Sequence, residues 1–507
     1  MIYLRRYSQQ LVLALLFILA FGIRLYHVNR PPLDFHATRQ YRSLLIARGY
    51  YFESAASLPE WERRVAEISK QRQGILEPPI MEVLVATGYR LLGGEQLWLP
   101  HVLSSLFWLL GGAFLYLISK RIADADAALA SLAFYLFLPF AIVASRSFQP
   151  DPLMVMLLLA AIWEILYFHE QPSRSRFLIS VGLSAFAFVV KPGSLFVLVA
   201  AFIALSISRY GIWKTVVSKS FWLFLVFTVA PAVSIYIYGT LNGTFLIGEA
   251  QKTVLPHLLL TSFFWRGWLN NIYTVVGYPA LITSLLGVLF LRPGTPRALL
   301  VGMWAGYMLF CLALNYNVAT HDYYQLQLVP ISALSLGPLV AFVARQALNM
   351  NRQWYWRAAL AAIAILALAL DLRFASSSLA GSNTEGIVRS EEKIGEQVGH
   401  STQNIFLASD YGVSLEYHGH LAGKPWPLQS DLEWERLADM PVLSAERRFQ
   451  TWFAQASPSY FIVLDVDEYK HQPDLEEFLT RTYPIVAQND DYLIFDLKRN
   501  QCYSTVC

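Results

Sequence analysis

The stretch LVLALLFILAFGIRLYHV (Leu11–Val28) decides the fold class, because about 18 apolar residues are long enough for a helix to cross a bilayer. It follows Arg5 and Arg6, as the apolar core of a signal peptide would. No small-residue cleavage pattern comes after it, however, and many further apolar stretches do. We therefore predict a retained membrane anchor rather than a cleaved leader.

Composition supports the same class. The chain has 507 residues, of which 55% are hydrophobic, 14% aromatic and only 15% charged. This is too apolar for a water-soluble protein of that length, so a polytopic membrane protein is predicted. A formal net charge of +3 gives no reason to expect a nucleic-acid partner. Three cysteines exclude a disulfide scaffold and disfavour a thiolate metal site.

Hydropathy over a window of about 19 residues predicts eleven membrane-spanning helices, give or take one. They fall near 11–28, 98–118, 126–144, 152–169, 176–190, 193–208, 220–239, 271–291, 298–315, 325–345 and 357–373. Arg and Lys gather in alternate short loops, beginning with Arg5 and Arg6, so the positive-inside rule predicts a cytoplasmic N-terminus. An odd number of spans then puts the C-terminal residues on the outer side.

The loop from Asn29 to Pro100 is long, basic and outside by this reckoning. Residues 38–52 alternate Arg with apolar residues at helical spacing, which predicts an amphipathic helix on the membrane surface, facing anionic headgroups. A polar helix is predicted near 59–72. The apolar run 80–92 is too short to span a bilayer and is predicted to be an interfacial helix.

The C-terminal residues 376–507 differ in composition, with Asn, Asp, Glu, Ser and His frequent. Residues 460–464 and 492–495 read as buried strands, and 431–437 and 445–456 have helical spacing. We predict a small extracytoplasmic α/β domain here, after a transmembrane domain of residues 1–375. Cys502 and Cys507 are either a short-loop disulfide or two free thiols.

Several polar residues lie at the outer ends of the predicted spans. Ionised side chains are costly in hydrocarbon, so those near span ends are usually either snorkelling or functional. One such residue alone favours snorkelling, but acids, cations and phenols together on one side predict a site. The residues are Asp34, Glu77, Arg146, Asp151, Lys191, His321, Asp322, Tyr323 and Tyr324.

Five motifs follow one another along the chain. They are Asp34 with Arg39, Gln40, Tyr41, Ser43, Ile46, Ala47 and Arg48; Glu77-Pro78-Pro79; Gln149-Pro150-Asp151-Pro152; Lys191-Pro192-Gly193; and His321-Asp322-Tyr323-Tyr324, with Pro330 after. In the order of these motifs and in the side of the membrane on which they are predicted, the first 340 or so residues resemble the GT-C superfamily of membrane glycosyltransferases. The branch with dolichyl-phosphate-mannose protein mannosyltransferases and bacterial lipid A aminoarabinose transferases is the most similar.

The resemblance implies a sugar carried on a polyprenyl phosphate and transferred with inversion to a lipid, glycan or protein acceptor outside the cytoplasmic membrane. Asp34 is the expected base that takes the acceptor proton. Cations that stabilise the leaving phosphate are expected to be Lys191 and Arg146, followed by His321 and Arg266. The remaining polar residues are expected to bind sugar or acceptor or to hold the cations: Glu77, Asp151, Asp322, Tyr323 and Tyr324.

Two departures from the family pattern affect these expectations. Asp34 is followed by Phe35 and His36 where the mannosyltransferases have adjacent acids, and Pro78 stands where the aminoarabinose transferases commonly have Lys. Arg residues of the predicted surface helix are therefore alternative phosphate ligands. No metal or other cofactor is expected, although Asp34 with His36 leaves a divalent metal open as the less favoured reading.

The main alternative is a secondary transporter or lipid flippase for a cell-envelope precursor, because many helices with membrane acids and a lysine also describe that class. Against it, the spacing of spans shows no internal repeat, and the polar residues gather on one face rather than at the midplane. A binding or assembly protein with a membrane anchor would not need eleven spans.

Overall fold

The computed structural model describes residues 2–55, 57–242, 254–350, 354–380, 384–438 and 440–499. By its internal contacts the chain forms two compact units. Unit 1 comprises Met1–Arg30, Ile75–Ile80 and Leu97–Gly381, and unit 2 comprises Pro31–Gly74, Met81–Gln96 and Ser382–Cys507. Most of the first long loop thus groups with the C-terminal residues, whereas the sequence analysis assigned it to the transmembrane part. Cys502 and Cys507 lie outside the described residues.

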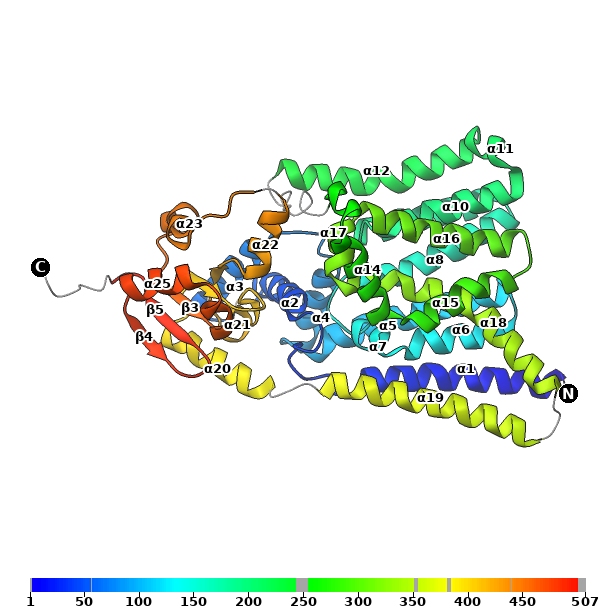
Figure 1. Cartoon of the computed structure of the whole chain (residues 1–507), viewed down its shortest axis with the longest axis horizontal. Coiled ribbons are helices and arrows are strands. Elements are labelled where there is room, and N and C mark those ends of the chain that lie inside the picture. Colours follow the sequence, from blue (N-terminus) through cyan, green and yellow to red (C-terminus); the bar gives the residue numbers. More distant parts are fainter. Residues whose placement is uncertain are drawn as a thin grey trace, which may run out of the picture. The chain divides into compact units, whose positions relative to one another are not determined.

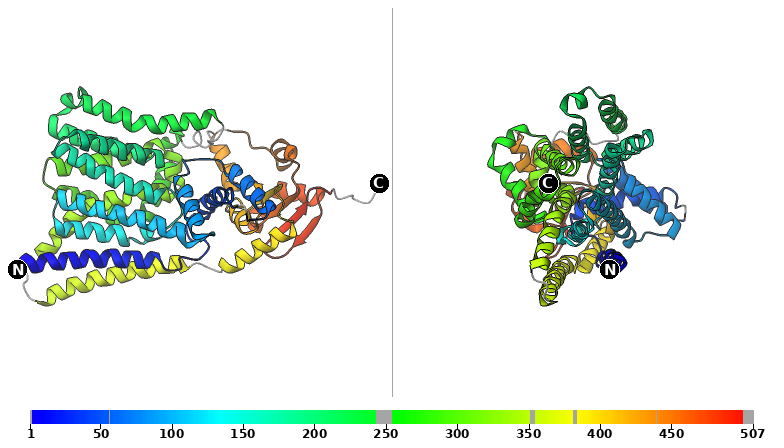
Figure 2. Two further views of the ribbon diagram at one scale, coloured as in Figure 1. Left: turned by 180° about the vertical axis from the view of Figure 1, so that it is seen from behind. Right: turned by 90° about the vertical axis from the view of Figure 1, so that its right-hand side faces the viewer.

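Unit 1 is helical, and its long helices run along one another (Figure 1), as the end-on view in Figure 2 also shows. The α-helices are α1 (Ile2–Arg24), α5 (Trp98–Ile122), α6 (Ala125–Phe137), α7 (Pro139–Ala144), α8 (Asp151–Glu170), α9 (Arg174–Val190), α10 (Ser194–Tyr210), α11 (Ile212–Val216), α12 (Lys219–Leu241), α14 (Ser262–Val275), α15 (Tyr278–Gly287), α16 (Thr295–Ala313), α17 (Asn315–Thr320), α18 (Leu328–Met350) and α19 (Trp354–Ala380). Short 3₁₀ helices are η1 (Pro256–Leu260), η2 (Val288–Phe290) and η3 (Asp322–Gln327).

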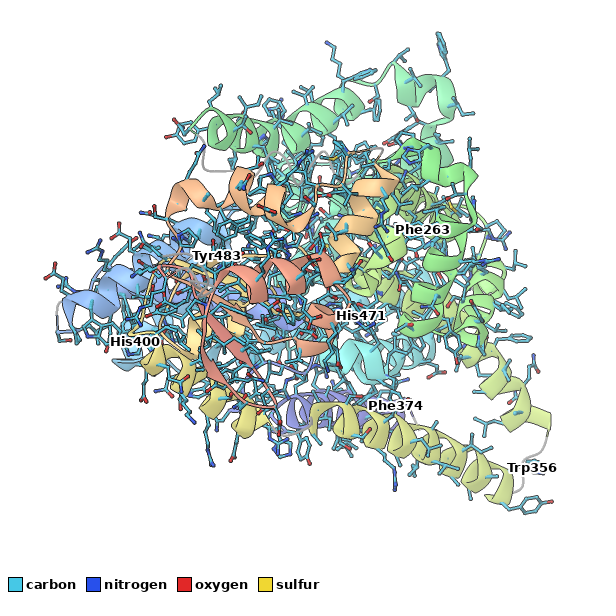
Figure 3. All side chains as sticks on the ribbon, turned by 60° about the vertical axis from the view of Figure 1, so that its left-hand side comes forward. Phe263, Trp356, Phe374, His400, His471 and Tyr483 are labelled. Atoms are coloured by element: carbon cyan, nitrogen blue, oxygen red, sulfur yellow. The ribbon has the colours of Figure 1, made fainter. Side chains whose placement is uncertain are left out.

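Length and composition make unit 1 a multi-pass membrane unit. Six of the described helices are long and apolar enough to cross a bilayer, or seven if one bent pair is a single span, and three further apolar helices are shorter. Each predicted span coincides with a helix or helix pair, although the total of eleven stays a prediction. Exposed apolar side chains such as Trp356 and Phe374 on α19 (Figure 3) suit contact with lipid.

The predicted span at 271–291 is not one straight helix, because the chain bends there. Ser262–Val275 and Tyr278–Phe290 meet at 85°. Gly277 stands between them at a φ of 74°, a left-handed conformation that favours glycine. Pro279 follows in the first turn of α15, where a residue without an N–H is tolerated. This local chemistry ends one helix and starts another.

Glycines bring α16 very close to α10. A Cβ atom on Gly302 would come within 2.8 Å of the Ala200 carbonyl oxygen, and one on Gly306 within 2.5 Å of the Phe196 carbonyl oxygen. The four-residue spacing of these glycines places them on one face of α16, the small-residue pattern that lets membrane helices approach. Backbone contact therefore fixes the position of α10.

Unit 2 contains a five-stranded sheet in the order β2-β1-β3-β5-β4. The strands are β1 (Asn404–Leu407), β2 (Gly423–Pro425), β3 (Tyr460–Val463), β4 (Ile485–Gln488) and β5 (Leu493–Asp496). β1 pairs in parallel with β2 and β3, while β5 is antiparallel to β3 and β4. The two strands predicted from the sequence are confirmed as β3 and β5.

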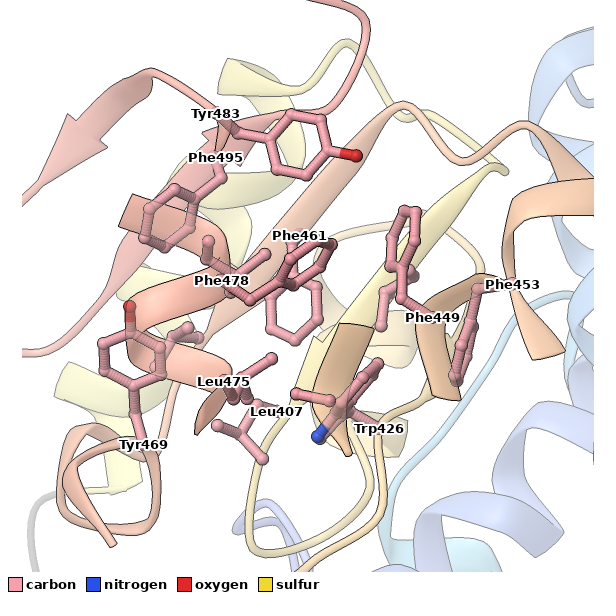
Figure 4. Packing of buried hydrophobic residues seen from close by; sticks show 14 of the residues in the cluster. Leu407, Trp426, Phe449, Phe453, Phe461, Tyr469, Leu475, Phe478, Tyr483 and Phe495 are labelled. Atoms are coloured by element: carbon pink, nitrogen blue, oxygen red, sulfur yellow. The ribbon is translucent and has the colours of Figure 1, made fainter. Parts of the chain in front are cut away.

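Helices cover both faces of this sheet. Neighbouring strand residues alternate between two hydrophobic clusters: Phe461 packs with Trp426 and Phe478 (Figure 4), and Ile462 packs with Ile394 on the other face. The helices are α20 (Thr384–Gln397), α21 (Val413–His418), α22 (Gln429–Leu437), α23 (Ala445–Trp452), α24 (Val466–Lys470) and α25 (Pro473–Thr482), with η4 (Ala454–Ala456). The helices predicted at 431–437 and 445–456 are confirmed as α22 and as α23 with η4.

The loop helices of unit 2 are α2 (Ala37–Phe52), α3 (Glu60–Gln73) and α4 (Ile80–Leu92). All three were predicted, but the surroundings expected for the first were wrong. Instead of lying on a membrane, α2 packs against α3 and α21 and is buried at almost every position from Gln40 to Phe52. By contrast α4 keeps an exposed apolar face at Val83, Leu84 and Leu91, as an interfacial helix requires.

Candidate functional site

The candidate site of unit 1 begins where two helices meet their loops. Asp151 is the first residue of α8, and Lys191 directly follows the last residue of α9. Prolines set both boundaries, because Pro150 and Pro152 flank Asp151 and Pro192 follows Lys191. The two side chains thus project from helix ends rather than from the apolar middle of a span.

Asp151 and Lys191 form a buried ion pair. Lys191 Nζ donates to Asp151 Oδ1 over 2.6 Å, and both side chains are almost fully buried. The ammonium also lies 5.1 Å from the ring centre of Tyr323 and 4.9 Å from that of Tyr324. Cation–π attraction of this kind holds a cation without using up its hydrogen-bond donors. The sequence-predicted residues Asp151, Lys191, Tyr323 and Tyr324 are therefore brought together.

His321 and Asp322 adjoin this cluster. His321 ends α17, accepts or donates a hydrogen bond of 2.7 Å with Thr320 Oγ1, and has its ring 5.4 Å from that of Tyr323. Asp322 opens η3, the 3₁₀ helix that carries both tyrosines. Asn317 Nδ2 donates to the Tyr324 hydroxyl over 2.7 Å and fixes that ring. The His321-to-Tyr324 motif therefore acts as one structural element.

Arg146 bonds to the backbone that follows α1. It is buried, and its guanidinium donates to the carbonyl oxygens of Tyr26 over 2.5 Å and of His27 over 3.3 Å. These carbonyls follow the end of α1, where helix carbonyls lack internal partners. The structure thus gives Arg146 the role of holding the end of α1.

Two further predicted residues of unit 1 differ in their surroundings. Arg266 is exposed on α14 and has no ion pair or hydrogen bond within the described parts of the chain. Glu77 is half-buried and lies within electrostatic range of Tyr236 on α12, which is also within range of Tyr324.

Asp34 belongs to unit 2. It lies between α1 and α2 in a non-helical turn, is half-buried, and accepts a long hydrogen bond of 3.4 Å from Gln40 Nε2. The same Gln40 amide donates more closely, over 2.6 Å, to the Phe35 carbonyl oxygen. Gln40 therefore restrains the turn that carries Asp34.

Unit 2 has its own buried ion pair, which the sequence analysis did not anticipate. Arg48 of α2 donates through Nε and Nη2 to Glu95, at 2.9 Å each, and through Nη1 to the Tyr417 carbonyl oxygen over 2.6 Å. Burial alone would lower the pKa of Arg48, but the Glu95 carboxylate more than offsets this and raises it. The expectation that Arg48 faces headgroups or a donor phosphate is therefore wrong.

Sequence reasoning also missed two glutamines of unit 1. Gln149 and Gln327 are both about 1% exposed. Both amide atoms of Gln149, Oε1 of Gln327 and Oδ2 of Asp151 are buried without a hydrogen-bond partner. Gln149 belongs to the motif Gln149-Pro150-Asp151-Pro152, but only the three-dimensional contacts distinguish an unpartnered amide from an ordinary buried one.

Metal ligands do not come together in the parts of the chain that the structure describes: no three His, Cys, Asp or Glu side chains form a group that could hold an ion. His36, the second ligand considered from the sequence, packs edge-on against the ring of Phe35.

Residues 76–238 match the family described as dolichyl-phosphate-mannose-protein mannosyltransferase. No curated protein sequence matches the chain. Among solved structures, ArnT from Cupriavidus metallidurans bound to undecaprenyl phosphate is similar with a TM-score of 0.55 at 15% identity, over 96% of this chain and 97% of that one. The Archaeoglobus fulgidus oligosaccharyltransferase complex with Zn and sulfate is similar with a TM-score of 0.56 at 11% identity, over 93% of this chain and 71% of that one.

A further structure of the archaeal enzyme, AglB in complex with an inhibitory peptide and a dolichol-phosphate, has a TM-score of 0.54 at 13% identity, over 95% of this chain and 73% of that one. ArnT and AglB are both glycosyltransferases of the GT-C superfamily. The resemblance to this superfamily predicted from the sequence is thereby confirmed, and the chain has its fold.

Proposed function

We propose that the chain transfers a sugar from a polyprenyl-phosphate donor to a lipid, glycan or protein acceptor, with inversion. The observation that carries this proposal is the incompletely bonded Lys191–Asp151 pair beside Tyr323 and Tyr324, at helix ends of a GT-C fold. ArnT was solved bound to undecaprenyl phosphate, which supports a lipid phosphate as the donor's leaving group.

In the proposed reaction, an acceptor oxygen attacks the anomeric carbon of the sugar. The bond from that carbon to the phosphate oxygen breaks, and the polyprenyl phosphate leaves with the bonding electron pair. Lys191 is the proposed counter-charge for the leaving phosphate, whose negative charge grows as the bond breaks. Arg146, His321 and Arg266 are further candidates for this role, and Arg146 also donates to the carbonyl oxygens that follow α1.

Asp34 is the proposed base that takes the proton of the acceptor hydroxyl. Its carboxylate is half-buried in a turn that Gln40 restrains, and a carboxylate held within hydrogen-bond reach of an acceptor hydroxyl can take its proton. Glu77, Asp151, Asp322, Tyr323 and Tyr324 are the proposed sugar- and acceptor-binding residues. For an acceptor that is already ionised, such as a phosphate, Asp34 would orient the acceptor instead.

We further propose that the protein lies in the cytoplasmic membrane with its N-terminus inside and unit 2 outside. The basic residues of the alternate short loops support this orientation. The reaction would then take place on the outer face, the periplasmic side in a Gram-negative cell, and would serve the cell envelope.

The test uses purified full-length protein, radiolabelled polyprenyl-phosphate sugars and membrane extract as the acceptor source. Asp34→Asn is expected to lower transfer about 10²- to 10⁴-fold, the usual contribution of a general base. The matched control is Asp490→Asn, at an exposed position of unit 2, which should transfer like wild type.

Undiminished transfer by Asp34→Asn would remove this residue from the role of base. Wild type that turns over no donor, but moves the intact donor across liposome membranes, would replace the proposal with the transport alternative.

A further inference from the structure

Gln149 is a buried amide whose hydrogen bonds the chain does not supply. Its side chain is 1% exposed, and neither Oε1 nor Nε2 has a hydrogen-bond partner. A 180° flip of the side-chain amide, which exchanges the oxygen and the nitrogen, would change nothing, since both atoms are unpartnered. Buried polar groups in native proteins are nearly always bonded, so each exception needs an explanation.

Two other buried glutamines of this chain, Gln325 and Gln472, show the ordinary behaviour. Gln325 accepts from the Tyr307 hydroxyl over 2.5 Å and donates to the Val318 carbonyl oxygen over 3.1 Å. Gln472 accepts from Trp426 Nε1 and donates to the Pro427 carbonyl oxygen. The fold is therefore able to satisfy buried amides, and Gln149 differs from them in a specific way.

Gln149 lies beside the candidate site. It precedes the first residue of α8 by two positions, and that residue is Asp151, the partner of Lys191. Asp151 uses Oδ1 for the lysine and leaves Oδ2 buried and unpartnered. Gln327 falls one turn of the 3₁₀ helix η3 after Tyr324, and side chains at this spacing share a face. Its Oε1 is unpartnered as well.

The numbers of unpartnered donors and acceptors indicate which chemical groups a ligand would need at this place. On Gln149, Asp151 and Gln327 together, the buried atoms without a hydrogen-bond partner are three acceptors, one on each residue, and one donor, Nε2 of Gln149. A phosphate offers acceptors only, so it cannot satisfy this set. Sugar hydroxyl groups both donate and accept, and amino groups donate, so a sugar matches it.

We infer that Gln149, with Asp151 Oδ2 and Gln327 Oε1, binds hydroxyl or amino groups of the donor's sugar rather than its phosphate. This inference rests on the proposed function and assigns to Gln149 a part in choosing the sugar. Lys191, on the other oxygen of Asp151, then serves the phosphate, so the carboxylate joins the two halves of the donor site.

The test measures binding of undecaprenyl phosphate with no sugar, and of the same lipid phosphate bearing glucose, arabinose or N-acetylglucosamine, to full-length protein. Gln149→Met removes the amide while keeping its size. We expect it to weaken the best sugar-bearing ligand at least tenfold and to leave undecaprenyl phosphate within twofold of wild type.

Gln325→Met is the matched control for folding. It removes the acceptor of the Tyr307 hydroxyl and one of the two hydrogen bonds to the Val318 carbonyl oxygen, so it should lower the thermal unfolding midpoint of the ligand-free protein. Gln149→Met leaves no new unpartnered group and should keep the midpoint of wild type or raise it. This second measurement separates loss of sugar binding from loss of fold.

Three outcomes would overturn the inference. Gln149→Met that binds every ligand like wild type would show that only water satisfies the amide. Equal loss of sugar-free and sugar-bearing ligands would place Gln149 at the phosphate. Wild type that binds undecaprenyl phosphate but gains nothing from any sugar would refute a sugar site and leave the proposed function standing. If wild type binds none of the four ligands, the proposed function itself fails.

Discussion

Unit 1 and unit 2 each bury a pair of opposite charges, and the two pairs differ in how completely their hydrogen bonds are used. Arg48 and Glu95 in unit 2 share three hydrogen bonds, and the guanidinium also binds the Tyr417 carbonyl and stacks 3.6 Å from the Tyr417 ring centre. Lys191 and Asp151 in unit 1 share one, with an Asp151 oxygen unpartnered. A saturated pair joins elements of the fold, whereas an unsaturated pair has capacity left for a ligand.

Replacing both charges of the unit 1 pair should have the largest effect. Lys191→Met with Asp151→Leu leaves no buried charge alone, so the helices are expected to stay folded. Glycosyl transfer should nevertheless fall about 10³-fold, the effect of removing a group that stabilises developing charge. Transfer assays and the thermal unfolding midpoint are measured together. A double variant with activity near that of wild type would mean that this pair, too, is structural.

Removing one charge of the unit 2 pair should cost stability first. Arg48→Met leaves the Glu95 carboxylate without its cation and is expected to lower the free energy of unfolding of α2 by about 3–5 kcal/mol. Hydrogen exchange of the α2 amides measures this. Arg48→Met with Glu95→Met should recover most of the loss and keep transfer activity. If the double variant folds but has lost activity, the saturated pair has a role in the reaction after all.

The stability of unit 2 is also expected to depend on pH, with a smaller effect. Glu391 and Glu416 are buried, which raises the pKa of each to about 8 from an ordinary 4.5. His418 and His420 are buried as well, which lowers their pKa values to about 3 and about 4 from 6.5. Between pH 6.5 and 8 the unfolded acids have lost protons that the folded ones keep, so unit 2 loses stability as the pH rises.

In this pH range each acid lowers the free energy of unfolding by about 1.4 kcal/mol for each unit that the pH rises. Below pH 6.5 the unfolded histidines bind protons that the folded ones exclude. Their contribution to the pH dependence of the free energy of unfolding is then opposite in sign to that of the acids, so this free energy changes less with pH. Hydrogen exchange of β1 and β3 from pH 6.5 to 8 measures the slope. Glu416→Gln should reduce it, while Glu476→Gln, at an exposed position, should not. A slope unchanged in Glu416→Gln would contradict a proton held on that side chain.

The exposed pair between Arg345 and Asp124 in unit 1 should have the smallest effect. Its side chains are 46% and 39% exposed, so water already solvates both charges. Arg345→Gln is expected to change the free energy of unfolding by less than about 1 kcal/mol and to leave transfer unchanged. The thermal unfolding midpoint checks this. A loss as large as that of Arg48→Met would show that burial does not distinguish the pairs.

Much of the helical fold could be predicted, because apolar length is a local property. Each predicted span coincides with a helix or a helix pair. The bend within 271–291 was not predicted, because the positive φ of Gly277 is visible only in the folded chain. The pattern of α2 also predicted a helix, but gave it the wrong surroundings. Arg48 has the same local sequence whether it faces a headgroup or Glu95, and Glu95 lies 47 residues away.

The candidate site was also predictable in part: several of its residues could be named from the sequence, but their contacts could not. Asp151, Lys191, Tyr323 and Tyr324 were named from polar residues at span ends, and the structure brings them together. Arg146 was named by the same reasoning, and its guanidinium donates to backbone carbonyls, a contact that the sequence did not predict. Partner identity decides between these cases, and sequence position does not encode it. The missing partners of Gln149 are for the same reason visible only in three dimensions.

The hydrogen bond from Arg48 to the Tyr417 carbonyl oxygen can form only late in the synthesis of the chain. The two residues are 369 positions apart in the chain. At translation speeds of about 5–20 residues per second, α2 must wait roughly 20–70 s for the residues that complete its surroundings. During that interval the face of α2 that packs against α21 is uncovered, although Glu95 follows Arg48 by only 47 residues and can pair with it early. Truncation before Val413, the first residue of α21, should therefore leave this face of α2 exposed to proteases.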